Sequence, residues 1–428
     1  MIKFFISFLA ISFILSSEVL SELELYYDTE DYLTAQQFLI DNTIENEDFY
    51  YLGYLISYKL DDLNKANEYL QLLFKIDEDD DERYSLAADH LSELINDLKN
   101  SNKTLTSGFI NESIAELTKL VDKYKNNAII YFRLGHAYKA NEDYDNAAIN
   151  FKKAVELNPY KSDYKNEIIA LANIEILKGK EFYDMKEYQD ALIHFNKAIE
   201  YDPENSSAMF RVGNIYFAIR DYVLAAEFLE KGLQYQNNNY KVLYMLGRCY
   251  SALSENDKAI EAYNMALEFN PSYTKASFEI AKIYKNMGDF DTSRNMLNDI
   301  IAISNDSKSY ELLLDIEIQT KNLSKALEIG ENGLSFNPDS YTLLFRMAGL
   351  YNELREYEKA KTSAKNSMKI KRNYAPAAFE LGIAEISLCN KVAAKEAFNK
   401  AKRDRNYRKA ASSYLKPENF EHYSSHCN

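Results

Sequence analysis

The residues best suited to chemistry lie near the C-terminal end of the chain. His422 and His426 are four residues apart, and Cys427 follows directly. Two His at this spacing share one face of a helix and, with a neighbouring thiolate, are able to ligate a metal. The alternative is a frayed tail rich in Ser. Because no further metal-ligating residue accompanies these three side chains in the sequence, we predict no metal and no cofactor.

The cysteines have different expected roles. Cys389 falls in a predicted turn near the place where the tail should lie, so a Cys389–Cys427 disulfide is one alternative in an oxidising compartment. A buried or free thiol is the other. Cys249 belongs to a predicted packed helix, where we expect it to be part of the core.

No catalytic motif accompanies these residues. The chain has no Gly-rich loop after a strand, no GxSxG, no HExxH and no kinase-like set. The remaining His, at 90, 136 and 194, are scattered. An enzymatic site in the segment 22–127 stays as an alternative that would require a pocket with perturbed titrating groups. We predict a protein that is not an enzyme.

The composition of the chain argues against nucleic-acid binding and favours one class of fold. The chain has 428 residues and a formal charge of -16, which argues against binding to nucleic acid because phosphates require a surplus of Lys and Arg. Only 12 Gly and 6 Pro interrupt it, so we expect an all-α fold.

The first residues resemble an export signal. Lys3 precedes a twelve-residue apolar run, Phe4 to Leu15, and small or polar residues follow from Ser16 to Ser21. This pattern is typical of a secretory signal peptide, cleaved after Ser17 or Ser21. The run is too short to span a bilayer, although a retained anchor is the alternative. We therefore assign 1–21 to a signal peptide and expect a secreted or periplasmic protein without stable membrane insertion, in either a bacterial periplasm or a eukaryotic secretory lumen.

A period of about 34 residues organises most of the chain. Small residues recur at one place in the period, with Leu314 as the misfit, and a second small residue follows twelve positions later. The first set is Gly135, Gly179, Gly213, Gly247, Ala281, Leu314, Ala348 and Gly382. Small residues allow neighbouring helices to approach closely, and one helix pair alone cannot bury its apolar face. The pattern predicts a right-handed α-solenoid of stacked antiparallel helix pairs.

The repeats resemble the tetratricopeptide repeat family. The repeat from Ala128 to Lys161 carries the matching residues Tyr131, Leu134, Gly135, Tyr138, Ala147, Phe151, Ala154 and Pro159. Eight repeats begin at 128, 172, 206, 240, 274, 307, 341 and 375 and end near 408. The 44-residue first step predicts a first helix lengthened by residues 160–171. The segment 22–127 is expected to hold divergent acidic repeats with a loop at 100–106, and 409–428 a capping helix and tail.

The resemblance implies a binding groove lined by the first helix of each repeat. Aromatic residues occupy the fifth place of six repeats, and basic or amide residues stand beside them. The residues predicted to line this groove are Phe132, Arg133, His136, Phe210, Arg211, Asn214, Tyr244, Arg248, Phe278, Lys282, Phe345, Arg346 and Phe379. Aromatic and Arg side chains suit a peptide with acidic groups. The alternative is that the aromatic residues pack against the neighbouring repeat. The family's two-carboxylate clamp is absent, since Phe210, Met245 and Glu279 occupy its places.

Charge is unevenly distributed along the chain. Residues 22–100 hold 21 acidic and 5 basic residues, whereas 355–416 hold 6 acidic and 16 basic residues. Solvated faces are one interpretation, and steering of partners or head-to-tail self-association is the other. Our leading hypothesis is a non-enzymatic scaffold that binds protein or peptide partners in the groove. The alternative is an extracytoplasmic assembly or chaperone-like factor for acidic clients.

Overall fold

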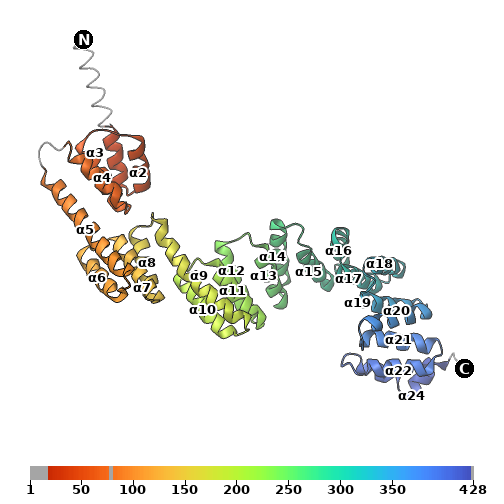
Figure 1. Ribbon diagram of the computed structural model, residues 1–428. Coiled ribbons are helices and arrows are strands. Elements are labelled where there is room, and N and C mark those ends of the chain that lie inside the picture. The colour runs from red at the N-terminus through yellow and green to blue at the C-terminus, as the bar shows by residue number, and fades with distance from the viewer. Residues whose placement is uncertain (1–17, 77–80, 426–428) are drawn as a thin grey trace, which may run out of the picture. The chain divides into compact units, whose positions relative to one another are not determined.

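The computed structural model describes residues 18–76 and 81–425 and is helical throughout this part of the chain (Figure 1). None of the described helices is both long and apolar enough to cross a membrane. The chain divides into two compact units, residues 1–215 and 216–428, and each is described by itself. The segments 22–127, 128–408 and 409–428 stay predictions, as does the signal peptide, of which residues 1–17 lie outside the described residues.

The N-terminal unit begins with a helical segment at 18–28. It continues with α2 (Tyr32–Asp41), α3 (Glu47–Lys59), α4 (Leu63–Leu73), α5 (Glu82–Thr106), α6 (Ile110–Lys123), α7 (Ala128–Ala140), α8 (Tyr144–Leu157), α9 (Ser162–Asp184), α10 (Tyr188–Tyr201) and most of α11 (Ser206–Ala218).

The C-terminal unit continues the series of helix pairs. It contains α12 (Tyr222–Tyr235), α13 (Tyr240–Ala252), α14 (Asn256–Phe269), α15 (Thr274–Met287), α16 (Phe290–Ser304), α17 (Ser307–Gln319), α18 (Leu323–Phe336), α19 (Tyr341–Glu353), α20 (Tyr357–Ile370), α21 (Ala375–Ser387), α22 (Lys391–Ala401), α23 (Arg408–Tyr414) and α24 (Pro417–Tyr423).

The first helices begin where the period places them. Seven of the eight repeats start a helix at their first residue, and α9 begins at Ser162, ten residues before the repeat does. This extension makes α9 23 residues long, as the 44-residue step predicts. The two helices of every repeat are joined at its fifteenth place by a residue of positive φ: Glu142, Lys186, Arg220, Ser254, Gly288, Lys321, Arg355 and Cys389. Because non-Gly residues at positive φ cost about 1 kcal/mol each, packing of the paired helices must stabilise these turns.

Close contact between a glycine and an aromatic ring joins the helices of several repeats. A Cβ atom added to Gly135 would lie 2.6 Å from the Phe151 ring, and one added to Gly247 would lie 2.5 Å from the Tyr263 ring. Gly382 and Phe398 repeat this relationship. The recurrent glycine therefore provides room for a ring sixteen residues further along.

The same relationship explains the misfit at Leu314. The place sixteen residues after it is Gly330 rather than a ring, and the Met347 sulfur occupies the space beside this glycine, 2.0 Å from where a Cβ would lie. Leu314 itself is fully buried in the same cluster as Met347. Large and small residues have exchanged places, so the volume of this part of the core is kept.

The predicted loop at 100–106 is wrong, because α5 continues as a helix to Thr106. Leu94, Leu98 and Ser101 follow each other at helical spacing and are all buried. Ser113 on α6 donates its hydroxyl to the Ser101 carbonyl oxygen at 3.1 Å. The polar composition of this stretch reflects the exposed faces of a helix rather than a loop.

Residues 408–423 near the C-terminal end form two short helices that pack against the last repeat. The Tyr414 ring of α23 stacks on Phe398 of α22 with ring centroids 4.7 Å apart. Phe420 of α24 is buried in the same cluster. These contacts cover the last helix pair, and they place His422 on a short helix rather than on a loose segment.

Candidate functional site

Three of the predicted groove residues line one pocket in the C-terminal unit. Tyr244 and Arg248 come from α13 and Phe278 comes from α15. The pocket has a volume of about 450 Å³. Its other lining residues are Thr274, Lys275, Glu279, Ile300, Asp306 and Lys308. We call this the Tyr244 pocket. It lies on the face formed by the first helices of three successive repeats, because α13, α15 and α17 each begin one.

The cations of the Tyr244 pocket have no acidic partner among the described residues. Arg248, Lys275 and Lys308 take part in none of the ion pairs found between residues 18–76 and 81–425. The Arg248 guanidinium lies over the Phe217 ring, 4.6 Å from its centroid, and 6.0 Å from that of Tyr244. Such stacking fixes the plane of the guanidinium while its N–H groups keep their ability to donate.

The acids of the same pocket are already engaged. Glu279 accepts a hydrogen bond from Lys282 at 3.2 Å. Asp306 caps α17 by accepting from the Ser309 backbone N–H at 2.9 Å. Three cations without ion pairs and two engaged carboxylates give the pocket a net attraction for anionic groups.

The fifth-place aromatic residues also pack against the next repeat. The Tyr244 ring lies 5.2 Å from that of Tyr273, and the Phe345 ring lies 5.7 Å from that of Tyr374. Phe379 contacts Tyr407 in the same way, at 5.6 Å. Tyr273 and Tyr374 directly precede the first helices α15 and α21, and Tyr407 directly precedes α23. The aromatic stripe therefore has a structural role in these three repeats, and a Tyr directly before the following helix was the sequence signal for it.

Two other predicted basic residues of the C-terminal unit are neutralised by neighbours. Lys282 pairs with Glu279, as described above. Arg346 forms an ion pair with Asp315, which also lies 3.8 Å from the Lys285 amine. Burial lowers the pKa of Arg346, and nearby Glu311 opposes this shift. Asp315 thereby connects α17 with α15 and α19, and both Lys282 and Arg346 contribute less to an anion site than Arg248 does.

In the N-terminal unit, Phe132 and His136 belong to an aromatic cluster. Phe132 lies 4.5 Å from both the His136 and the Tyr164 ring. Burial lowers the pKa of His136, against the influence of Glu167, whose carboxylate is 3.9 Å from Nε2. Arg133 is exposed on the adjacent surface of α7.

The other three predicted residues of this unit lie around α11. Phe210 is only 8% exposed and offers little surface to a ligand. Arg211 lies over the Phe195 ring at 5.7 Å, and its buried Nε has no hydrogen-bond partner among the described residues. Asn214 and Arg211 line a small cavity of about 30 Å³ with Tyr183 and Phe195.

The metal and cysteine hypotheses concern residues that are partly outside the described chain. The described residues contain no group of three or more His, Cys, Asp or Glu side chains able to hold a metal ion. His426 and Cys427 lie outside them. Cys389 is disulfide-bonded, whereas Cys249 is a buried free thiol.

Comparison with known families agrees with the repeat pattern. Residues 128–161 and 274–307 match the model of the tetratricopeptide repeat. These two segments each carry a tetratricopeptide repeat. Residues 184–266, between these two, match the model of subunit 3 of the anaphase-promoting complex, or cyclosome. No curated protein matches the chain significantly.

Solved structures resemble the chain at low sequence identity. A tetratricopeptide repeat protein from Parabacteroides merdae has a TM-score of 0.45 and 19% identity, over 56% of this chain and 96% of that one. Yeast Tom70 has a TM-score of 0.41 and 16% identity, over 92% of this chain and 94% of Tom70. The Cut9–Hcn1 hetero-tetramer of the anaphase-promoting complex has a TM-score of 0.44 and 14% identity, over 93% of this chain and 89% of the matched chain. We draw no functional conclusion from these likenesses.

Proposed function

We propose that this protein is a non-enzymatic scaffold that binds an acidic segment of a protein partner at the Tyr244 pocket. Tetratricopeptide repeats are typical of proteins that mediate protein–protein interaction. The observation that carries the proposal is the set of three cations, Arg248, Lys275 and Lys308, without ion pairs among the described residues around the aromatic rings of Tyr244 and Phe278.

The chemistry of this set favours a carboxylate-bearing segment. The stacked Arg248 guanidinium is held in a fixed plane, so it loses little freedom when it binds a carboxylate through two parallel hydrogen bonds. Lys275 and Lys308 extend the positive region over neighbouring helices. The rings of Tyr244 and Phe278 offer apolar contact area for the stem of an acidic side chain or for an adjacent apolar residue.

A charge-reversal experiment tests the proposal. A fluorescein-labelled peptide with alternating Asp and Phe residues serves as the probe, and its affinity is measured by anisotropy at physiological salt. We expect the K275E/K308E variant to bind at least about tenfold more weakly, since each inverted charge replaces attraction with repulsion. K231E/K258E, which changes net charge equally on the second helices, is the control and should stay within about twofold. Equal losses in both variants would refute a local site.

We also propose that the protein acts outside the cytoplasm. The support is the sequence of residues 1–21, with its single Lys, short apolar run and small residues before the first buried position. The alternative function, an assembly or chaperone-like factor for acidic clients, predicts a short-lived complex that dissociates with rising salt. A complex that survives size-exclusion chromatography in 1 M salt would favour the scaffold, because salt at that concentration screens charges beyond about 3 Å.

Head-to-tail self-association of the acidic and basic ends stays a prediction. Sedimentation velocity at 50 mM and 500 mM salt provides the measurement. A single monomeric species in both conditions would exclude it.

A further inference from the structure

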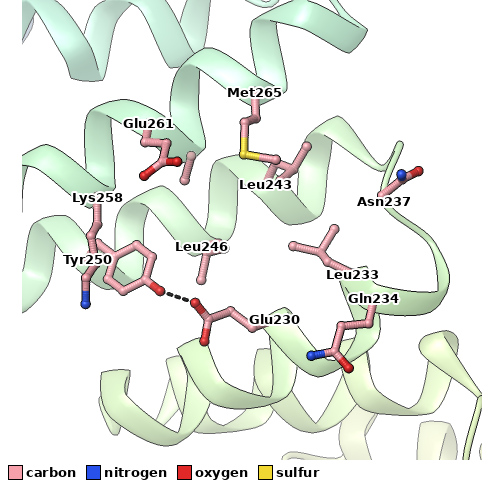
Figure 2. Close-up of a pocket in the computed structure, with 11 residues that line it drawn as sticks. Glu230, Leu233, Gln234, Asn237, Leu243, Leu246, Tyr250, Lys258, Glu261 and Met265 are labelled. Carbon is pink, nitrogen blue, oxygen red and sulfur yellow. Dashed lines mark hydrogen bonds between the residues drawn. The ribbon is translucent and has the colours of Figure 1, made fainter.

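The outer surface of the C-terminal unit contains a second pocket, distinct from the Tyr244 pocket. It has a volume of about 600 Å³ and lies over α13, between the second helices α12 and α14. Its floor consists of Leu243 and Leu246, which are buried in the rest of the fold. Figure 2 shows these two side chains between α12 and α14, with the Tyr250 hydroxyl donating to Glu230 at one end of the floor.

The pocket is elongated along both flanking helices. It is lined on one side by Glu230, Leu233 and Gln234 of α12 and by Asn237 in the turn after this helix, and on the other side by Lys258, Glu261, Ala262 and Met265 of α14. The α14 set follows the spacing i, i+3, i+4 and i+7, which is one face of a helix. Seven residues of helix rise by about 10 Å, so the pocket is a groove about two turns long.

The corresponding second helices of the N-terminal unit, α8 and α10, flank a smaller pocket of about 360 Å³, and polar residues line it. Between α8 and α10, Asp145 receives an ion pair from Lys197 at 2.8 Å and a hydrogen bond from the Tyr201 hydroxyl at 2.7 Å. These three polar residues bridge the two second helices. The same places on α12 and α14 are occupied by Val223, Met265 and Phe269, which cannot form such bonds.

The three replacements also leave apolar surface exposed to water. Val223 is 61% exposed, Met265 39% and Phe269 46%. In the other seven repeats the place of Met265 is Lys, Asp or Asn. An apolar residue at a place that is otherwise polar, beside an apolar pocket, indicates a surface that is covered in a complex.

The charged residues beside the groove indicate the charge of the partner that would cover it. Asp257, Glu261 and Glu268 are exposed on α14, and none of them forms an ion pair with a described residue. Their spacing of four and seven residues places them on one side of the helix, next to Met265. The one cation of the groove, Lys258, is bound to Glu255 at 2.7 Å. A complementary partner therefore combines an apolar stripe with an adjacent row of Lys or Arg.

We infer that the groove between α12 and α14 binds a basic amphipathic helix of a partner protein. The flanking backbone is already hydrogen-bonded within helices, so an extended segment would leave its own N–H and C=O groups unpaired over the apolar floor, whereas a helix pairs them internally. Apolar side chains of the partner helix enter between Leu233 and Met265. Its basic residues contact Glu261 and Glu268. This surface is independent of the Tyr244 pocket, which attracts the opposite charge.

The test uses three synthetic peptides of about 16 residues and fluorescence anisotropy with the full chain lacking its first 17 residues. The first peptide is a helix with Leu at i, i+3, i+4 and i+7 and a row of Lys beside them. The second has Glu in place of Lys. The third has the composition of the first in an order that forms no apolar stripe. We expect saturable binding of the first peptide and at least tenfold weaker binding of the other two.

Variants then assign the binding to the groove. V223D/M265K introduces the acid and base found at Asp145 and Lys197, and should reduce affinity for the first peptide at least tenfold. I303K, which changes an equally exposed apolar residue on α16, and K275E/K308E should leave it within twofold. Circular dichroism melting verifies that each variant is folded.

Several outcomes would overturn the inference. Absence of saturable binding by the unmodified protein is one, equal binding of the Lys and Glu peptides is another, and unchanged affinity of V223D/M265K is a third. A concentration-dependent dimer in sedimentation equilibrium that V223D/M265K abolishes would instead assign the groove to a second copy of this chain.

Discussion

Asn158 donates a hydrogen bond of 2.6 Å from its Nδ2 to Oδ2 of Asp61, although 97 residues separate them in the chain. The Tyr164 hydroxyl donates to the same oxygen at 2.8 Å. Asp61 forms the turn between α3 and α4, and Asn158 ends α8. This acceptor therefore ties the first helix pairs of the N-terminal unit to the junction of α8 and α9.

Replacing Asp61 is expected to loosen this connection. D61A removes the acceptor for two buried donors, and it also places Ala at a φ of 58°, so we expect a loss of about 1–3 kcal/mol in the free energy of unfolding. D61N is the matched control, since Asn tolerates this backbone conformation and keeps an acceptor oxygen. Burial raises the pKa of Asp61, against the two donors, so the neutral Asn should be at least as stable as the native residue.

Hydrogen exchange distinguishes the two variants. Amides of α3 and α4 should exchange faster in D61A than in the unmodified protein, and at the normal rate in D61N. Uniformly faster exchange over the whole N-terminal unit would contradict a local connection.

A buried ion pair in the C-terminal unit should make stability depend on pH. Glu317 is fully buried and accepts a bond of 2.6 Å from Arg294 Nε and one of 2.9 Å from Asn322. Burial raises the pKa of Glu317, but these two donors outweigh it and the net shift is downward. The folded pKa thus lies below the unfolded value of about 4.3. The stabilisation that ionised Glu317 gives to the folded state is complete above about pH 4.3, the unfolded pKa, and is lost as the pH falls through the folded pKa.

Urea unfolding of the chain between pH 7 and pH 3, followed by circular dichroism, measures this effect. E317Q should lose stability at pH 7 and show a flatter dependence on pH than the unmodified protein. E261Q, at an exposed site, is the control. Parallel pH profiles for E317Q and the unmodified protein would contradict the assignment.

Apolar replacement of the same pair provides a second test. E317L leaves the Arg294 guanidinium without its buried partner and should cost about 3–5 kcal/mol. The double variant R294M/E317L removes both charges and should recover most of that loss. A double variant as unstable as E317L would indicate that the pair is retained for packing geometry rather than for charge.

A glycine in a first helix should be intolerant of a methyl group only where a ring faces it. G247A would bring a Cβ within 2.5 Å of Tyr263 and should cost about 1–3 kcal/mol. G349A meets nothing closer than 3.5 Å and should be neutral or stabilising by about 0.5–1 kcal/mol, because Ala favours helices. G247A/Y263L should recover stability relative to G247A. Thermal unfolding of the three variants decides whether the ring causes the restriction.

Processing at the N-terminus should preserve the first packed helix. Leu23 is fully buried, and Val19 and Leu20 pack against the same cluster. Cleavage after Ser17 keeps these residues, whereas cleavage after Ser21 removes two of them. We expect intact-mass analysis of the exported protein to find Glu18 as the first residue. A mature chain that begins at Glu22 with unchanged thermal stability would contradict the importance of this packing.

The cysteines should differ sharply in reactivity. Burial raises the pKa of the Cys249 thiol to about 12, so little thiolate is available at pH 8. We expect Cys249 to react with iodoacetamide only after unfolding in urea. Cys389, which is disulfide-bonded, should be labelled only after reduction. Labelling of Cys249 in the folded protein would show that α13 opens frequently.

The repeat period determined most of the local structure. It predicted the starting residues of the first helices and the extension of α9, because apolar and small residues must recur on the buried face of every helix pair. It failed at 100–106, where one buried stripe, ending in Ser101, is enough to continue a helix whose other faces are polar. Leu314 also departed from the pattern, since its compensating residue, Gly330, lies at a different place in the repeat.

The tertiary structure decided which of the thirteen predicted groove residues meet. The sequence predicts both Arg248 and Arg346 as basic groove residues, but packing places Asp315 beside Arg346 and leaves Arg248 without an acidic partner among the described residues. Whether a charge is neutralised depends on neighbours from other repeats, which the spacing of one repeat does not specify. The same holds for Val223 and Met265: each is one exposed apolar residue in the sequence, and only the packing of α12, α13 and α14 reveals the groove beside them.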